Sequence, residues 1–163
     1  QQNQLFKNIG GQFTDVTHLA GAIFDIVEVS RGAAFGDVDN DGDTDVLVGN
    51  GAGPVRLLLN HLGEHNHWVG LRLVGQTETG EIHDLLGARV AVFRANAETL
   101  WRRARTDGSY ASANDPRVLV GLGDSITITQ IRVVWPSGRS ETWPSVPLDQ
   151  YTTLIEGTGA TLP

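Results

Sequence analysis

Residues 37–45 read Asp-Val-Asp-Asn-Asp-Gly-Asp-Thr-Asp, which places a carboxylate at every second position. Aspartates at this spacing repel one another at neutral pH, so neither an ordinary strand nor an ordinary helix favours them unless a cation lies among them. Calcium relieves such repulsion, because it takes roughly six to eight oxygen ligands in flexible geometry. We therefore predict a structural calcium site here. Its expected side-chain ligands are Asp37, Asp39, Asp41 and Asp45, with the backbone carbonyl of Asp43 turned inward.

Gly42 supplies the sharp turn that such a loop needs, because glycine reaches positive φ at low cost. An EF-hand loop opens with the same D-x-D-x-D-G spacing, but it also needs a glutamate at its twelfth position and a helix on each side. Here the twelfth position is Val48, and the flanking residues 33–36 and 46–49 are short, apolar and bounded by glycine. They favour two strands joined by the loop. The alternative is an acidic, solvated turn without metal.

The composition bounds the class of protein. A chain of 163 residues with 40% apolar residues has room for one ordinary domain or two small ones. Its 20 glycines, together with frequent Val, Thr and Ile, favour short strands with many turns. The net charge of −7 makes nucleic acid a poor partner.

Several other features narrow the expectations. The absence of cysteine excludes a disulfide framework and thiolate chemistry. The sequence has no apolar run long enough to span a membrane. The chain begins Gln1-Gln2-Asn3 and contains no Met, so we expect a processed or excised C-terminal piece of a longer protein.

The segments around the loop predict further strands. Two short apolar runs flank Gly10-Gly11, which is a hairpin signal. Residues 49–54 form a turn pattern, and residues 55–60 follow as a strand. Residues 61–67 are a polar junction, and we place a domain boundary between residues 62 and 63.

The junction contains three histidines, His61, His65 and His67. They raise the possibility of zinc, which needs three or four converging ligands. Glu64 is the only other candidate ligand nearby in the sequence, so a solvated linker is the favoured interpretation.

The second half predicts a regular series of strands without a convincing helix, which is typical of a β-sandwich or barrel. A turn at residues 136–138 separates two of these strands, with Gly138 at a position of positive φ. The expected strands are 68–74, 88–93, 99–106, 118–122, 126–135, 139–143 and 151–155.

The first half carries an ordered set of motifs. They are Phe35-Gly36-Asp37, the D-x-D-x-D-G-x-x-D loop, Val46-Leu47-Val48-Gly49-Asn50 and Leu57-Leu58-Leu59-Asn60. In this order they resemble the FG-GAP/VCBS repeat, and residues 5–8 and 13–17 resemble the segment between such repeats. The resemblance implies one four-stranded, calcium-binding blade of an integrin-type β-propeller. A single blade cannot bury both faces, so either other blades were removed or this unit packs on the second half of the chain.

The second half carries a different set of motifs. They are Asn66-His67-Trp68-Val69-Gly70-Leu71-Arg72-Leu73-Val74-Gly75, Gly87-Ala88-Arg89-Val90, Gly108-Ser109-Tyr110, Asp115-Pro116-Arg117, Val120-Gly121-Leu122-Gly123 and Trp135-Pro136-Ser137-Gly138. Their order resembles the ASPIC/UnbV domain. The resemblance implies a domain that follows FG-GAP/VCBS repeats at the C-terminus of secreted proteins similar to the cartilage acidic protein family. We therefore expect an FG-GAP/VCBS-type repeat at residues 1–62 and an ASPIC/UnbV-type β domain at residues 63–163.

Three further features suggest surfaces or packing. Trp101-Arg102-Arg103-Ala104-Arg105 is a basic cluster in which Trp101, Arg103 and Arg105 would share one face of a strand and could hold a sugar or an anionic glycan. A solvated face with arginine stems over apolar surface is the favoured interpretation. The polar loop from residue 108 to residue 117 could line a binding surface or simply connect strands. Trp135 and Trp143 are expected to pack in the core or at its edge, in preference to forming a carbohydrate platform.

Catalytic signatures are absent. The sequence has no G-x-S-x-G, no H-E-x-x-H, no phosphate-binding glycine loop and no thiol nucleophile, so we predict no enzyme activity and no catalytic residues.

The prediction is an all-β, calcium-binding module that is secreted, either extracellular or periplasmic. Adhesion or binding of an extracellular protein or glycan is the expected function, without nucleic acid and without a membrane span. One alternative is an accessory C-terminal part of a larger secreted enzyme. Another is a structural assembly module that associates with itself through exposed strand edges.

Overall fold

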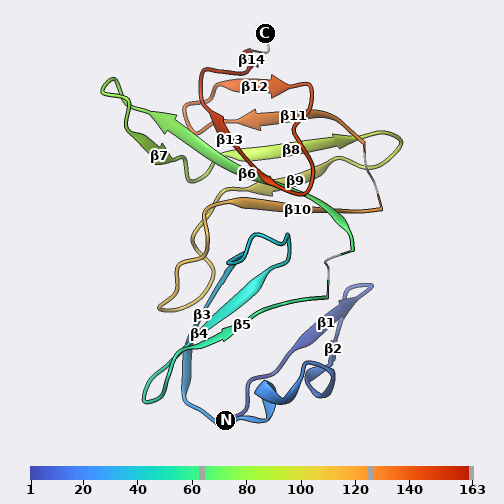
Figure 1. The fold of residues 1–163 in the computed structure, drawn as a ribbon, viewed down its shortest axis with the longest axis vertical. Coiled ribbons are helices and arrows are strands. Elements are labelled where there is room, and N and C mark those ends of the chain that lie inside the picture. The colour runs from blue at the N-terminus through green and yellow to red at the C-terminus, as the bar shows by residue number, and fades with distance from the viewer. Residues whose placement is uncertain (63–64, 125–126, 162–163) are drawn as a thin grey trace.

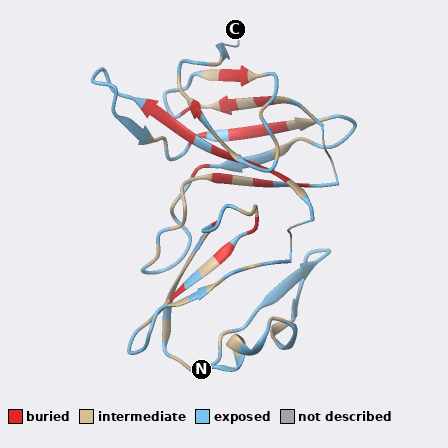
Figure 2. Ribbon diagram, viewed as in Figure 1, coloured by how far each residue is buried: buried red, intermediate tan, exposed pale blue. Residues whose placement is uncertain are grey.

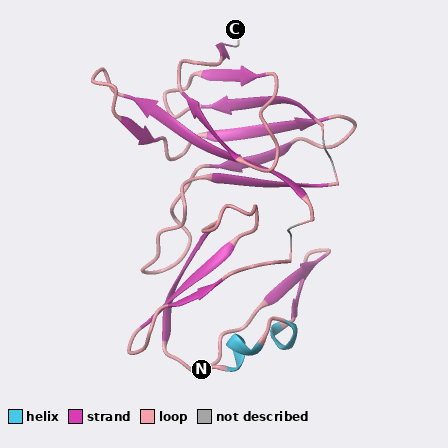
Figure 3. Ribbon diagram, in the orientation of Figure 1, coloured by secondary structure: helices cyan, strands magenta, loops and turns pink. Residues whose placement is uncertain are grey.

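The computed structural model describes residues 1–62, 65–124 and 127–161. This described part of the chain is all-β, with fourteen strands (Figure 1). Its helices are two short 3-10 turns, η1 (Thr17–Leu19) and η2 (Ala22–Asp25), which follow the first hairpin (Figure 3). Within the described ranges, no helix has the length and apolar character needed to cross a bilayer.

The first sheet is a two-stranded hairpin of β1 (Phe6–Ile9) and β2 (Gln12–Asp15). The strands are antiparallel, and both glycines of the connecting turn, Gly10 and Gly11, have positive φ. Two consecutive residues of positive φ are what a tight hairpin turn demands, which is why a Gly-Gly pair is found there. The predicted hairpin is confirmed.

The second sheet has three antiparallel strands in the order β3-β4-β5. They are β3 (Ser30–Gly36), β4 (Asp45–Asn50) and β5 (Arg56–Leu58). The expected flanking strands therefore exist, and the stretch between Gly36 and Asp45 joins β3 to β4. The repeat resemblance implied a four-stranded blade, whereas this sheet contains three strands.

The residues from β6 onward build two larger sheets in the upper half of Figure 1. One has the order β10-β6-β13, with β7 paired to β6, and the other has the order β14-β12-β11-β8-β9. β13 runs parallel to β6, whereas the other strand pairs of these two sheets are antiparallel. The strands are β6 (His67–Gln76), β7 (Ile82–Asp84), β8 (Arg89–Arg94), β9 (Leu100–Arg103), β10 (Val118–Gly123), β11 (Ile128–Val134), β12 (Ser140–Trp143), β13 (Tyr151–Ile155) and β14 (Ala160–Thr161).

These two sheets form a β-sandwich around one hydrophobic core. Alternate residues of β10 and β11 are buried, since side chains in a strand point to opposite faces in turn. β6 and β8 instead carry runs of consecutive buried residues, because both faces of these strands are covered. Figure 2 shows how the buried positions gather in this half of the molecule. The core includes Val69, Leu71, Leu73, Val90, Val92, Val118, Val120, Leu122, Ile131, Val133, Trp135 and Leu154.

The strand predictions for this half hold, with differences at four strands. β9 ends at Arg103, not at residue 106, and neither β7 nor β14 was among the predicted strands. The strand expected at 126–135 begins outside the described residues, and β11 itself spans Ile128–Val134. Trp135 is buried and meets Trp143 edge-to-face at 6.3 Å between ring centroids, while Trp143 is partly buried against the core, so the predicted core or edge packing of the two tryptophans is confirmed. Gly138 has the positive φ expected of its turn.

A candidate cation loop that contacts the sandwich

The aspartate loop, residues 37–45, is held by its two end residues. Gly36 pairs with Asp45 across β3 and β4, so the antiparallel ladder brings Asp37 and Asp45 close together. Both are almost completely buried, with exposed fractions of 2% and 1%. Buried carboxylates at neutral pH need hydrogen-bond donors or a counter-charge.

Backbone N–H groups supply the donors. Asp37 Oδ1 accepts a hydrogen bond from the Asp41 amide at 3.1 Å, and its Oδ2 accepts one from the Gly42 amide at 3.0 Å. Asp45 Oδ2 accepts a bond from Val38 N at 2.8 Å, and its Oδ1 accepts one from Asn60 N at 2.9 Å. The two buried carboxylates therefore shape the loop, and Asp45 also holds the segment that follows β5 in place.

The side chains in and beside the loop form two groups that could each hold a cation. Carboxylate oxygens of Asp37, Asp39 and Asp45 all lie within 4.8 Å of one another. A second group within the same limit joins Asp39 and Asp41 to a ring nitrogen of His61. Asp43 is buried, and its amide donates to Asp41 Oδ1 at 2.9 Å. Three of the four expected side-chain ligands thus converge on one point, and Asp41 lies in the neighbouring group.

The proximity of these carboxylates affects the pKa of Asp39. Desolvation, followed by the charges of Asp41 and Asp45, raises the pKa of Asp39 above its ordinary value. Two oxygens that bind one calcium ion at about 2.3–2.6 Å can lie at most about 5 Å apart, so the 4.8 Å limit fits three ligands of a single ion. The ligand atoms that Asp37, Asp39 and Asp45 offer are all carboxylate oxygens, which suit a hard divalent cation and not a soft one.

Gly42 is required by two separate features of the loop. Its φ is 93°, a conformation that glycine adopts and other residues disfavour. A Cβ at this position would also overlap the indole ring of Trp68, which lies in β6 at the start of the sandwich. The loop therefore packs its tightest turn directly against the second half of the chain.

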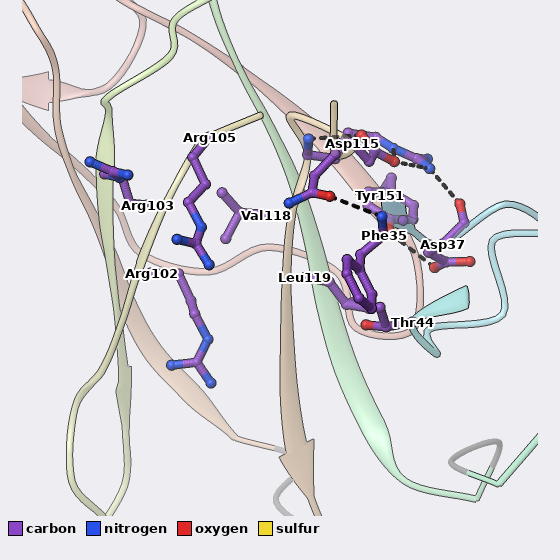
Figure 4. A pocket seen from close by; sticks show the side chains of 13 residues that line it. Phe35, Asp37, Thr44, Arg102, Arg103, Arg105, Asp115, Val118, Leu119 and Tyr151 are labelled. Carbon is purple, nitrogen blue, oxygen red and sulfur yellow. Dashed lines mark hydrogen bonds and ion pairs between the residues drawn. The ribbon is translucent and has the colours of Figure 1, made fainter. Parts of the chain in front are cut away.

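Besides Trp68, two side chains of the sandwich form hydrogen bonds with the loop (Figure 4). The Tyr151 hydroxyl donates to Asp37 Oδ2 at 2.9 Å. Arg117 donates through Nη2 to the backbone carbonyl of Asp37 at 2.5 Å and through Nη1 to Asn40 Oδ1 at 2.6 Å. We call the contacts of Trp68, Arg117 and Tyr151 with the aspartate loop the docking contacts.

Arg117 and Tyr151 hold each other in place. The Arg117 guanidinium carbon lies 4.0 Å from the centre of the Tyr151 ring, and its Nε donates to Asp115 Oδ2 at 2.7 Å. The hydrogen bond with Asp115 raises the pKa of Arg117. Burial, together with the hydrogen bond to Asp37, raises the pKa of Tyr151 well above its ordinary value. The tyrosine therefore remains a neutral donor toward Asp37.

The polar loop of residues 108–117 contacts β3. The Asp115 amide donates to the Phe35 carbonyl at 2.9 Å, and the Phe35 amide donates to Asn114 Oδ1 at 3.0 Å. A Cβ at Gly36 would lie 2.8 Å from that of Asp115, so the two backbones are in close contact. These contacts join the two halves of the chain, which is a role beyond the two considered for this loop from the sequence.

A groove lies beside the docking contacts. We call it the arginine groove; its arginines are Arg102, Arg103, Arg105 and Arg117, with Phe35, Val118 and Leu119 as apolar lining. Arg103 pairs with Asp107 at 3.1 Å, whereas the sole hydrogen bond of Arg102 within the described ranges goes to the backbone of Trp101. Arg105 makes no hydrogen bond or ion pair with any described residue. Figure 4 shows Arg102 and Arg105 extending in a similar direction and Arg103 turned to another side.

This arrangement changes the expectation for the basic cluster. β9 ends at Arg103, but Ala104 still exchanges backbone hydrogen bonds with Gly87 and Ala88 and is buried between the exposed Arg103 and Arg105. Arg102, expected on the opposite face from Arg103 and Arg105, lines the groove together with them, and Trp101 is not among the lining residues.

The histidines of the junction separate in space. His61 lies beside Asp39 and Asp41, and His67 Nδ1 is 2.8 Å from Asp149 Oδ2. This contact lowers the pKa of Asp149. Among the described residues, His61, His65 and His67 do not form a metal-binding group with one another, and Glu64 lies outside the described residues.

Sequence reasoning missed the docking contacts. Arg117 and Tyr151 lie 80 and 114 residues from Asp37. Neither residue belongs to a local sequence pattern that predicts contact with an aspartate loop. The one available signal was Asp115-Pro116-Arg117, a rigid, charged stretch directly before a strand.

Comparisons with known proteins bear on the second half of the chain. The family described as ASPIC and UnbV matches residues 78–161, which is more than half of the chain. One relative, Cartilage acidic protein 1 of Xenopus tropicalis, is 41% identical over 58 residues, which are 35% of this chain and 9% of that protein. The chain thus spans a small part of the length of that relative. The protein belongs to the ASPIC and UnbV family.

Proposed function

We propose that this chain is a non-enzymatic, calcium-binding module of an extracellular protein, in which calcium has a structural role. The observation that carries the proposal is the convergence of Asp37, Asp39 and Asp45 within 4.8 Å. These residues would hold the ion, with Asp41 and the Asp43 carbonyl as further candidate oxygen ligands. The ion would supply positive charge at a point where three carboxylates meet.

The burial of the loop supports a bound cation. Asp37 and Asp45 are 2% and 1% exposed, and neither forms an ion pair with a described lysine or arginine side chain. An uncompensated buried carboxylate costs several kcal/mol by the usual order of magnitude, and N–H donors offset only part of that cost. Calcium at this site offsets the remainder, so stability should depend on calcium by mass action.

We further propose that residues 1–62 are an FG-GAP/VCBS-type unit and that residues 63–163 are a separate ASPIC/UnbV-type domain. The support is the antiparallel order of β3, β4 and β5 around the aspartate loop, together with one uncovered apolar face. Leu47 and Leu57 are cross-strand partners that both remain exposed. A neighbouring blade in a longer protein, or a second copy of this chain, would cover such a face.

An extracellular setting is supported by the relative's name, which describes an acidic protein of cartilage. Extracellular calcium modules typically bind the ion with a dissociation constant of roughly 10⁻⁴–10⁻³ M, a range that suits a structural site outside the cell. Within this extracellular setting, adhesion is the function that we propose. The alternative is an accessory end of a larger secreted enzyme, which a catalytic domain in the full-length protein would favour.

The arginine groove favours a second candidate function, the binding of an anionic glycan. In a chain of net charge −7, Arg102 and Arg105 enter the same groove without a described carboxylate partner. Phe35 lines the groove and is 44% exposed, so its aromatic ring would be available to a sugar. Titration with a sulfated oligosaccharide, beside an Arg105→Ala variant and a neutral oligosaccharide, tests this function.

A thermal melt tests the calcium proposal. Calcium should raise the Tm of the wild-type chain relative to excess chelator, and Asp45→Asn should abolish that response. Asp25→Asn is the matched control, because Asp25 is an exposed aspartate outside the loop and should retain the full response. Coinciding wild-type curves with and without calcium would contradict the proposal.

A further inference from the structure

We propose that the sandwich completes the cation site, so that ion binding by the aspartate loop and the docking contacts form one coupled equilibrium. Tyr151 would be a positioning residue for the ligand Asp37, and Arg117 would fix the loop backbone. This inference rests on the proposed calcium site. It assigns a role in that site to residues of the ASPIC and UnbV domain.

Asp37 has few acceptor sites left for an ion. A carboxylate offers about four acceptor sites. Three donors from the protein already reach Asp37, namely the Asp41 amide, the Gly42 amide and the Tyr151 hydroxyl. About one acceptor site then remains, and the group with Asp39 and Asp45 shows where an ion would use it. The Tyr151 hydroxyl is the one donor of the three that comes from outside the loop.

Tyr151 is held rigidly by the sandwich. The residue begins β13, whose backbone pairs with the core strand β6. Its ring lies 5.2 Å from the Trp68 ring and beneath the Arg117 guanidinium. The ring also occupies the space where a Cβ of Gly70 would lie. The sandwich thus fixes the position of the hydroxyl, which can act as a rigidly placed hydrogen-bond donor to Asp37.

Arg117 carries a positive charge, which by itself would oppose a bound cation. Its two hydrogen bonds to the loop go to the Asp37 carbonyl and the Asn40 amide oxygen, not to a carboxylate. Its Nε is bound to Asp115 in the sandwich. Arg117 therefore holds the loop backbone while the carboxylate oxygens remain available to an ion.

These three contacts couple docking to ion binding. When the loop separates from the sandwich, Asp37 loses the Tyr151 donor, and the loop loses both bonds to Arg117. Ion affinity should then fall, and by thermodynamic reciprocity removal of the ion should weaken docking by the same factor. The Asp115 amide reports docking, because it donates to Phe35 across the same contact.

The test combines calcium titration by calorimetry with hydrogen exchange. Tyr151→Phe removes only the hydroxyl, and Tyr110→Phe is the matched control because Tyr110 is 81% exposed and is the other tyrosine of the chain. Loss of a hydrogen bond to a charged group predicts a calcium affinity about tenfold lower for Tyr151→Phe. Tyr110→Phe should bind as the wild type does.

A second variant keeps the test valid if Tyr151→Phe perturbs the fold. Asn40→Gly removes one acceptor of Arg117, while glycine tolerates the φ of 63° at this position. Calcium should slow exchange of the Asp115 amide in the wild type, and Asn40→Gly should reduce that slowing.

The possible failures can be told apart. A wild-type chain that binds no calcium would overturn the proposed function and this inference with it. Wild-type binding with unchanged affinity in Tyr151→Phe, and with no effect of calcium on Asp115 exchange, would overturn this inference alone.

Discussion

The two halves of the chain stabilise themselves in different ways. Among the buried apolar residues of the described chain, Val48 alone comes from the half before residue 62, and the others belong to β6 and the elements after it. Most of the large exposed apolar residues lie in that first half. The sandwich therefore buries its own core, whereas the first half relies on hydrogen-bonded carboxylates, the docking contacts and whatever covers its apolar face.

The largest expected effect contrasts two leucines. Leu71 is fully buried in the sandwich, and Leu57 is 47% exposed on β5. Leu71→Ala should lower the free energy of unfolding by about 2–5 kcal/mol, through lost burial and the cavity left behind. Leu57→Ala should change it by less than about 0.5 kcal/mol. Chemical denaturation of both variants measures the contrast, and equal effects would refute it.

A smaller effect is expected at the buried carboxylate of the sandwich. Glu141 accepts hydrogen bonds from Trp135 Nε1 at 2.7 Å and from the Gly157 amide at 3.0 Å. Glu141→Gln should cost about 1–3 kcal/mol, because a side-chain amide would turn an NH₂ group toward one of these donors. The exposed Glu78→Gln serves as control in the same denaturation series. A neutral Glu141→Gln would mean that this carboxylate contributes little to the core.

The uncovered face of the first half predicts weak self-association. Leu57→Lys should lower the association constant at least about tenfold, since a charge on that face opposes burial. Thr153→Lys places the same charge on an exposed strand residue of the sandwich and should leave association unchanged. Sedimentation across a range of concentrations tests both. A wild-type chain that stays monomeric throughout would show that a second copy does not cover this face.

The smallest expected effect is a dependence of stability on pH. Desolvation and two neighbouring carboxylates raise the pKa of Asp39, so the ion-free folded state binds this proton more tightly than the unfolded chain. Without calcium, stability should therefore fall as pH rises through this titration. With calcium, which binds ionised carboxylates, it should rise over the same range. Melts between about pH 4 and pH 7, in calcium and in chelator, measure the two slopes, and slopes of the same sign would contradict a calcium site at Asp39.

Local patterns were sufficient to predict much of the fold. Gly10-Gly11 predicted a hairpin, and Gly42 predicted the positive φ of the aspartate loop. Alternating apolar residues predicted the strands of the sandwich, because burial on one face imposes a period of two. β7 was missed since its residues, Ile82–Asp84, carry no such alternation and pair only at an edge of the sheet.

The candidate site was only partly predictable. The sequence located the aspartates, but it could not show that Asp41 falls with His61 while Asp37, Asp39 and Asp45 converge. The docking contacts depend on how two separately patterned halves pack, and no spacing within either half encodes the meeting of Tyr151 with Asp37.

A crystal structure grown in calcium tests the central proposal most directly. We expect one ion, identified by its anomalous signal, bound by oxygens of Asp37, Asp39 and Asp45 at about 2.3–2.6 Å. A loop of the same conformation without an ion at saturating calcium would contradict it. The aspartates would then act only as acceptors that shape a turn.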